Sequence, residues 1–246
     1  MKNLLLALII GIAPLLAHAN EGGMTNYKAD IDLENKSSLQ RGARLFTNYC
    51  LSCHSAAYMR YNRMGADLGL TDKQVANNLM FAADKVGETM TVAMTKHDAA
   101  KWFGTKIPDL SVVARARGSD WLYTYLLTFY VDPKRPWGVN NERFPNVGMP
   151  DILWELEGMK KPVYKMHKTH EGHEEKTLVG FEMVTPGKLS PVEFKDSVKD
   201  LVNYLTYMGE PVKLKRQRWG VLVMIFLAIF FFVAYALKKE YWRDVH

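Results

Sequence analysis

The chain has 246 residues, of which 48% are hydrophobic and 24% charged, and its formal net charge is +6. This composition excludes a disordered or collagen-like chain, and a mean hydropathy of -0.17 excludes a multi-span transporter. Only two cysteines are present, which excludes a disulfide framework and a zinc site of four cysteines. Because a basic chain invites a nucleic-acid interpretation, the location of the charge has to be established.

The N-terminus has the pattern of an export signal. Lys2 precedes an apolar run at residues 4–16, and Ala17-His18-Ala19 supplies a cleavage pattern of small residues. A short membrane helix is the alternative, but about thirteen apolar residues are too few to span a bilayer comfortably. We therefore expect residues 1–19 to be a signal peptide that is removed before Asn20.

Residues 20–212 form the expected exported domain, and their pattern is mainly α-helical. Ser37-Ser38 can cap a first helix that runs through Phe46 to Cys50. Further helices are expected at 98–103, 110–116 and 121–130.

That first helix leads into Cys50-Leu51-Ser52-Cys53-His54, which is typical of covalent haem attachment. Two cysteines three residues apart present both sulfurs to the vinyl groups of one haem, and the adjacent histidine reaches the iron. Both cysteines would be consumed as thioethers, which explains why an exported chain has no others. We expect one haem c, bound through Cys50 and Cys53 and ligated by His54.

Three other interpretations of the cysteine pair stay open at this point. A thioredoxin-like redox pair needs a preceding strand, whereas a helical pattern leads into Cys50. A zinc site needs two more ligands, most plausibly loop histidines. A structural disulfide suits an oxidising compartment but leaves His54 unexplained.

A methionine thioether is the expected sixth ligand, because it raises the potential of the iron and suits an electron carrier. Met149 lies on the Gly- and Pro-containing loop 146–151, within a longer loop region that begins at Asp132. The alternatives are Met90, Met94, Met183 and His97. Arg115 and Arg117 are candidates to pair with the haem propionates.

The charged stretch 160–176 carries His167, His170 and His173 and is expected to be a solvated loop or a partner contact. Residues 177–184 are a weak candidate for a short hairpin arm. The last helix of the domain has the clearest start signals: Ser190 as N-cap, Pro191 at the first position and Glu193 completing a capping box. Gly209-Glu210-Pro211 closes it.

Residues 219–237 form a run of nineteen residues without a charge. Such a helix is about 28 Å long, enough to cross the hydrocarbon core of a membrane. Basic residues flank it on both sides, and Trp and Tyr rings lie near both ends. We expect one transmembrane anchor, with residues 238–246 as a short cytoplasmic tail because the signal peptide exports the preceding domain.

With these residues in place, the chain resembles the cytochrome c1 family, the haem-bearing subunits of the cytochrome bc1 (ubiquinol–cytochrome c reductase) complex. The resemblance covers nearly the whole mature chain and is most specific at Pro108-Asp109-Leu110-Ser111 with Ala114-Arg115-Ala116-Arg117. It implies a class I cytochrome c-like haem domain with long loop insertions. It further implies Met149 as sixth ligand and Arg117 beside a propionate.

The resemblance also implies a function: one-electron transfer from the Rieske iron–sulfur subunit to a periplasmic cytochrome c, next to a cytochrome b subunit. The chain would be an electron-transfer subunit in the inner membrane and no enzyme by itself. The alternative is a membrane-tethered monohaem cytochrome that feeds a terminal oxidase. A haem enzyme or gas sensor with an open iron site, and a redox-thiol protein, are further alternatives.

The location of the charge argues against nucleic-acid binding. Residues 20–212 contain 24 basic and 24 acidic residues, so the exported domain is neutral. The excess lies in the signal and beside the apolar run at 219–237, where anionic lipid headgroups are the natural partner. Docking of a redox partner must therefore depend on local patches.

Overall fold

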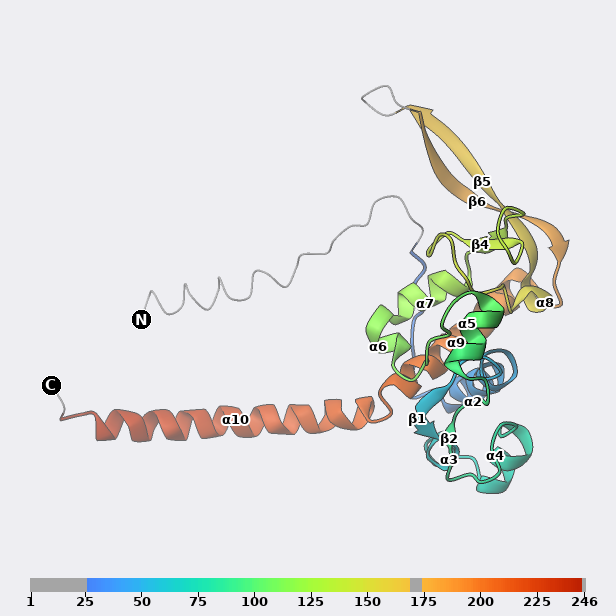
Figure 1. The fold of residues 1–246 in the computed structure, drawn as a ribbon. Coiled ribbons are helices and arrows are strands. Elements are labelled where there is room, and N and C mark those ends of the chain that lie inside the picture. The colour runs from blue at the N-terminus through green and yellow to red at the C-terminus, as the bar shows by residue number, and fades with distance from the viewer. Residues whose placement is uncertain (1–25, 169–173, 245–246) are drawn as a thin grey trace.

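The computed structural model describes residues 26–168 and 174–244, and most of these belong to one helical domain that carries a long C-terminal helix (Figure 1). The helices are α2 (Lys36–Leu45), α3 (Tyr61–Leu68), α4 (Asp72–Asn78), α5 (Lys96–Phe103), α6 (Val113–Arg117), α7 (Ser119–Leu126), α8 (Trp154–Glu157), α9 (Pro191–Gly209) and α10 (Lys213–Tyr241). The strands are β1 (Ala56–Arg60), β2 (Thr89–Met90), β3 (Phe129–Val131), β4 (Val139–Asn141), β5 (Gly158–Lys168) and β6 (Glu174–Pro186). A helical architecture is thus confirmed.

Helices α2 and α9 form the centre of the core. Gly42 lies so close to α9 that a Cβ atom there would be 2.1 Å from the Asp200 carbonyl oxygen. Next to this contact Arg41 donates two hydrogen bonds to the Asp200 carboxylate, at 2.5 and 2.9 Å. The expected capping box of Ser190 and Glu193 at the start of α9 is confirmed.

Helix α2 continues into a π-helical segment, Phe46–Cys50. Its buried side chains include Phe46, whose ring lies 5.5 Å from that of Tyr204 on α9. Because a π turn is wider than an α turn, it shifts the register of the residues that follow. The first cysteine of the attachment motif therefore stands at the end of an irregular turn, where the sequence pattern alone predicts a regular helix.

The predicted helix 121–130 was too long. Helix α7 ends at Leu126, and Phe129–Val131 forms strand β3, which pairs antiparallel with β4 inside the expected loop region. Polar side chains cause this ending: Asn141 Nδ2 donates to the Tyr125 carbonyl at 2.7 Å, and the Thr128 hydroxyl donates to the Thr124 carbonyl at 2.8 Å. They occupy carbonyl groups that a continuing helix would use.

The expected loop at 160–176 is another correction, because β5 and β6 form one long antiparallel hairpin there. In Figure 1 it extends away from the helical domain. Its register shifts after Met159 and Val163, which breaks the strict alternation by which strands are recognised in a sequence. The backbone of His167 lies in β5, opposite Glu175, whereas His170 and His173 lie outside the described residues.

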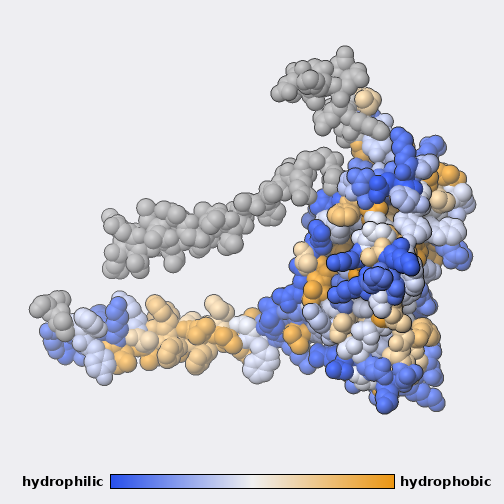
Figure 2. All heavy atoms as spheres, in the orientation of Figure 1, coloured by the Kyte–Doolittle hydropathy of each residue, from blue (hydrophilic) through white to orange (hydrophobic). Residues whose placement is uncertain are grey.

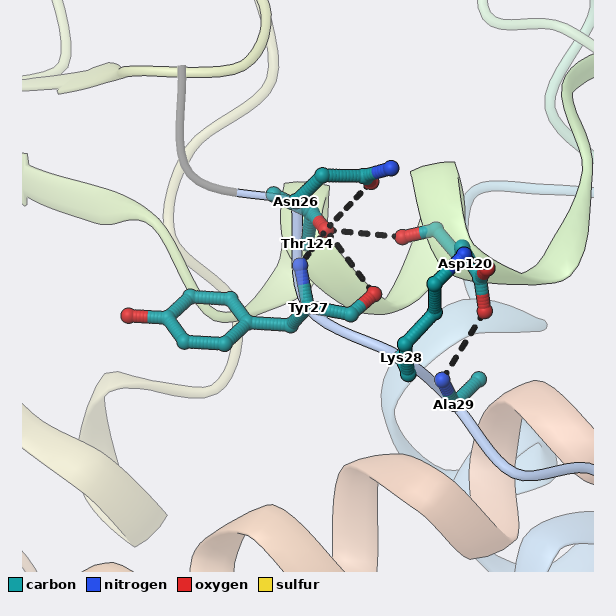
Figure 3. Close-up of polar contacts among 6 residues, drawn as sticks. All are labelled: Asn26, Tyr27, Lys28, Ala29, Asp120 and Thr124. Carbon is teal, nitrogen blue, oxygen red and sulfur yellow. Dashed lines mark hydrogen bonds and ion pairs between the residues drawn. The ribbon is translucent and has the colours of Figure 1, made fainter. Parts of the chain in front are cut away.

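The N-terminal segment of the described chain lies along α7 (Figure 3). The Tyr27 N–H donates to the Thr124 hydroxyl at 2.9 Å, and the Ala29 N–H donates to Asp120 at 2.9 Å. Lys28 forms an ion pair with the same Asp120 carboxylate at 2.8 Å. We call residues 26–29 the N-terminal strap.

Helix α10 is the one helix among the described residues that is long and apolar enough to cross a membrane. Figure 2 shows its hydrophobic stretch between hydrophilic ends. None of its residues is buried against the domain. The predicted signal segment, 1–19, lies outside the described residues.

Candidate haem site

The attachment motif is folded into a single tight turn. The N–H groups of Cys53 and His54 both donate to the Cys50 carbonyl, at 3.1 and 2.8 Å. This turn places the two cysteines and the histidine side by side, as attachment to one haem requires. Neither cysteine is in a disulfide.

A second segment, Pro108–Ser111, lies along His54 and the residues that follow the motif, and four hydrogen bonds join the two stretches. Leu110 N–H donates to the Ser55 carbonyl at 2.8 Å, and Asp109 accepts from the Ala57 N–H at 2.9 Å. The Ser111 hydroxyl accepts from the Tyr58 N–H at 3.1 Å. The fourth contact joins the His54 ring to the Pro108 carbonyl.

That fourth contact determines the tautomer of His54. Its Nδ1 lies 2.8 Å from the Pro108 oxygen, which can only accept, so Nδ1 carries the proton. The lone pair then remains on Nε2, the atom free to bind a metal. Burial lowers the pKa of His54, an effect opposed by the Pro108 hydrogen bond and by Asp109. The neutral imidazole, which is the ligand form, is therefore favoured.

Cys50, Cys53, His54 and Met149 all line one cavity. The rest of its wall is largely apolar and comes from several elements: Phe103, Ile107, Leu110, Val113, Trp121, Leu122, Tyr125, Leu126, Phe144, Val147, Ile152, Leu201 and Leu205. Removal from water raises the pKa of the Cys50 thiol to about 12. The cavity thus combines two thiols, an imidazole nitrogen and a thioether sulfur in an apolar environment, a donor set that fits haem c.

The loop that carries Met149 is held by side chains from neighbouring turns. Arg135 donates to the Asn146 carbonyl at 2.9 Å, and the Asn140 side chain accepts from the Asn146 N–H at 2.8 Å. Gly148 allows the loop to approach Thr105, because a Cβ at this position would lie 3.2 Å from the threonine methyl. These contacts fix the methionine on the cavity wall.

Tyr125 contacts the sulfur of Met149 and is a site residue that the sequence interpretation missed. Its hydroxyl donates to Met149 Sδ at 3.4 Å, and burial raises the pKa of that hydroxyl, which keeps it protonated. The Tyr125 ring stacks on Trp121 with the centroids 5.1 Å apart. The only sequence signal is an aromatic pair at positions i and i+4, which ordinary core helices share.

The two candidate arginines lie in different places. Arg117 lines the cavity, and its guanidinium lies 5.0 Å from the centre of the Trp121 ring. Arg115 is outside the cavity wall, beside Gly209 at the end of α9.

The alternative sixth ligands all lie outside the cavity wall. Met90 is buried in the core, where Tyr204 donates to its sulfur at 3.6 Å. The His97 side chain is 88% exposed. Met94 and Met183 also do not line the cavity. Met149 is therefore the one of these candidates that shares the cavity with His54.

Comparison with known protein families matches residues 31–245 to the Cytochrome C1 family. The chain belongs to this family. It is 49% identical to the cytochrome c1 of Allochromatium vinosum over the full length of both chains. It is 43% identical to a protein of Nitrosomonas europaea named ammonia monooxygenase gamma subunit, over 100% of this chain and 99% of the relative. Cytochrome c1 of Rhodospirillum rubrum is 28% identical over 93% of this chain and 92% of its own.

Membership of the cytochrome c1 family implies haem-dependent electron transfer within a bc1-type complex. It also implies that the chain is an electron-transfer subunit and is not itself a catalytic enzyme. Together with α10, it indicates a membrane-anchored subunit. The expectation drawn from the attachment motif and from the Pro108–Arg117 segment is thus confirmed at the level of the family.

Proposed function

We propose that the chain is the membrane-anchored monohaem cytochrome of a quinol–cytochrome c reductase, which receives one electron at a time from the Rieske iron–sulfur subunit and passes it to a periplasmic cytochrome c. The observation that carries this proposal is the cavity that Cys50, Cys53, His54 and Met149 line together. Cytochrome b and the iron–sulfur subunit would oxidise the quinol.

Each site residue has a defined role in this proposal. Cys50 and Cys53 would hold one haem c through thioethers, and His54 Nε2 and Met149 Sδ would bind its iron, as the resemblance to class I cytochromes c implies. Arg117 neutralises a propionate, and Arg115 is the weaker candidate because it lies outside the cavity wall. The bound haem supplies a one-electron couple of ferric and ferrous iron. The chain holds the imidazole and the thioether on the wall of one cavity, and the edge of the bound haem would be the route for electrons.

The proposed arrangement in the membrane follows from the two ends of the chain. Residues 1–19 are cleaved as a signal peptide, and residues 20–212 form the haem domain in the periplasm. Residues 219–237 span the inner membrane, and 238–246 remain in the cytoplasm. The continuous helix Lys213–Tyr241 supports the span.

Purification from membranes in mild detergent tests the function directly. We expect a pyridine haemochrome spectrum of one haem c per chain, together with a cytochrome b and a Rieske-type protein in the same sample. Recovery of a haem–copper oxidase without cytochrome b would contradict the proposal. The relative named ammonia monooxygenase gamma subunit gives a second candidate, and co-purification of a monooxygenase would favour that role.

Replacement of the sixth ligand tests the site. Met149→Leu removes the thioether, and we expect a high-spin haem or a fall in reduction potential, because the thioether stabilises ferrous iron. Optical spectra and a redox titration measure both effects. Met90→Leu is the matched control, since Met90 lies in the core and outside the cavity. An unchanged spectrum and potential in Met149→Leu would remove Met149 from the ligand role.

A further inference from the structure

The charged side chains on the wall of the haem cavity are both cationic. Among the described residues that line it, Lys106 and Arg117 are the only ionisable nitrogen groups apart from His54, and none carries a carboxylate. Both residues are exposed, as are Thr105 and Phe144 of the same wall. The solvent-facing part of the cavity is therefore bordered by positive charge.

Two further lysines lie on the elements next to this border. Lys101 is on α5, two residues before Phe103, and Lys134 is in the turn before Trp137. The Phe103 and Trp137 rings are in contact, with centroids 5.6 Å apart, which joins the two elements. The side chains of Lys101, Lys106 and Lys134 are exposed, and none of them has a hydrogen bond or ion pair with another described residue.

The carboxylates of the same segments are engaged by the protein itself. Asp109 accepts from Ala57 and Ser111 N–H groups, and Asp132 accepts from Lys134 N–H and the Asn140 side chain. Asp98 accepts from the Thr95 hydroxyl at the start of α5, and Asp151 accepts from Leu153 N–H. These carboxylates are hydrogen-bonded to donors of their own segments. The ammonium groups of Lys101, Lys106 and Lys134, in contrast, are exposed to solvent without such partners among the described residues.

Two exposed aromatic side chains belong to the same elements as these lysines or to the same cavity wall. Trp137 and Phe144 are each 44% exposed, and Phe144 belongs to the cavity wall. We call Lys101, Lys106, Lys134, Trp137 and Phe144 the cationic rim. A small apolar centre with charges around it is typical of short-lived complexes, in which charge directs the encounter and little area is buried.

We propose that the cationic rim is the docking surface for the electron acceptor, and that this acceptor is a small soluble one-electron carrier with an acidic surface. The inference rests on the proposed function, since it places the exit of electrons at the haem cavity. Because residues 20–212 are neutral overall, the rim and not the net charge of the domain selects the partner.

The test uses the intact complex in detergent and two acceptors of matched potential, one cytochrome c of net negative charge and one of net positive charge. At low ionic strength the complex should reduce the acidic acceptor faster. Lys106→Glu should slow this reaction about tenfold and accelerate reduction of the basic acceptor, because steering changes association rates by roughly 10- to 1000-fold. The preference for the acidic acceptor and the effect of Lys106→Glu should both disappear at high salt, because salt screens the charges. Lys134→Glu should act in the same direction.

Lys73→Glu is the matched control, because Lys73 is exposed on α4 and no residue of α4 lines the cavity. It should change both rates less than twofold. The proposal is overturned if Lys106→Glu leaves the acidic reaction unchanged, or if it slows both acceptors equally, which would indicate an altered potential. It is also overturned if the variant slows reduction of the haem by quinol when no acceptor is present, since the rim would then contact the iron–sulfur subunit.

The two proposals fail in distinguishable ways. A sample without covalent haem, or without reduction by quinol, fails the proposed function before any acceptor is added. A complex that reduces its haem normally but shows no preference between the acceptors fails only the docking inference.

Discussion

At the scale of single residues, the site contains groups that touch the proposed ligand residues His54 and Met149 and that are not themselves proposed as ligands. The Pro108 carbonyl fixes the proton of His54 on Nδ1, and the Tyr125 hydroxyl donates to the Met149 sulfur. Such outer contacts tune the basicity of metal ligands. Here they come from segments far from the attachment motif in the sequence.

Tyr125→Phe should lower the reduction potential. A hydrogen bond withdraws electron density from sulfur and favours ferrous iron, so its removal favours the ferric state. We expect a shift on the order of tens of millivolts, since one net hydrogen bond contributes roughly 1 kcal/mol. Redox titration of the purified complex measures it. Tyr123→Phe is the control on the same helix, because the Tyr123 hydroxyl bonds the Lys195 carbonyl and lies outside the cavity wall. An equal potential in both variants would contradict the role of Tyr125.

The residues of the site differ in how far the sequence reveals them. Cys50, Cys53 and His54 lie within five consecutive residues, so one local motif defines them. Met149 lies almost a hundred residues away; its Gly- and Pro-containing loop favours it among 13 methionines, and the family resemblance strengthens that choice. Tyr125 and Trp121 have no local signature, since their function depends on the loop that folds against them.

At the scale of elements, the contact between α2 and α9 fixes the start of the attachment motif. Gly42→Ala should destabilise the fold by about 3 kcal/mol, the upper part of the range for overpacked cores, because the added Cβ meets a backbone oxygen that cannot rotate away. Denaturant unfolding followed by the haem absorption band measures this. Gly87→Ala adds a Cβ with no atom within 4 Å and should be nearly neutral. Similar unfolding midpoints for both variants would refute the packing interpretation.

The N-terminal strap should hold α7 more weakly in acid. Burial alone would raise the pKa of Asp120, but Lys28 and the Ala29 N–H together lower it. A carboxyl group whose pKa is lower in the folded than in the unfolded protein stabilises the fold at pH values above its unfolded pKa of about 4. That contribution is lost as the pH falls through the folded pKa. Asp120→Asn should therefore lower the melting temperature at pH 7 and have little effect near pH 3. Asp72→Asn, in the first turn of α4, is the control; a pH-independent effect of Asp120→Asn would contradict the ion-pair explanation.

The start of α9 was predictable because Ser190 and Glu193 form a capping box. The cap expected at Ser37-Ser38 was wrong: α2 begins at Lys36, and the Asn35 side chain caps it by accepting from the Ser38 N–H. The β5–β6 hairpin was not, because charged residues fill its strands and two register shifts break their alternation. The end of α7 depends on Asn141, a tertiary contact that no local pattern shows. Local signals therefore predicted the helices better than the strands.

At the scale of the whole molecule, the anchor should account for membrane attachment. A chain that ends at Val212 lacks α10 and should appear in the soluble periplasmic fraction, whereas the full chain should resist extraction with alkaline carbonate. Immunoblots of both fractions measure this. A truncated chain that still resists carbonate would show that residues 4–16 remain as a second membrane segment, and would contradict cleavage of the signal.

The connection between domain and anchor is short. Residues 210–212 alone separate α9 from α10, and Glu210 and Glu34 form ion pairs with Arg216 and Arg218 at 2.5 and 3.1 Å. The six residues before the apolar run add a rise of about 9 Å, close to the thickness of one headgroup layer. The haem cavity is thereby held at one height above the bilayer. In the proposed function, the donor and the acceptor would therefore have to move, with this subunit as the stationary relay between them.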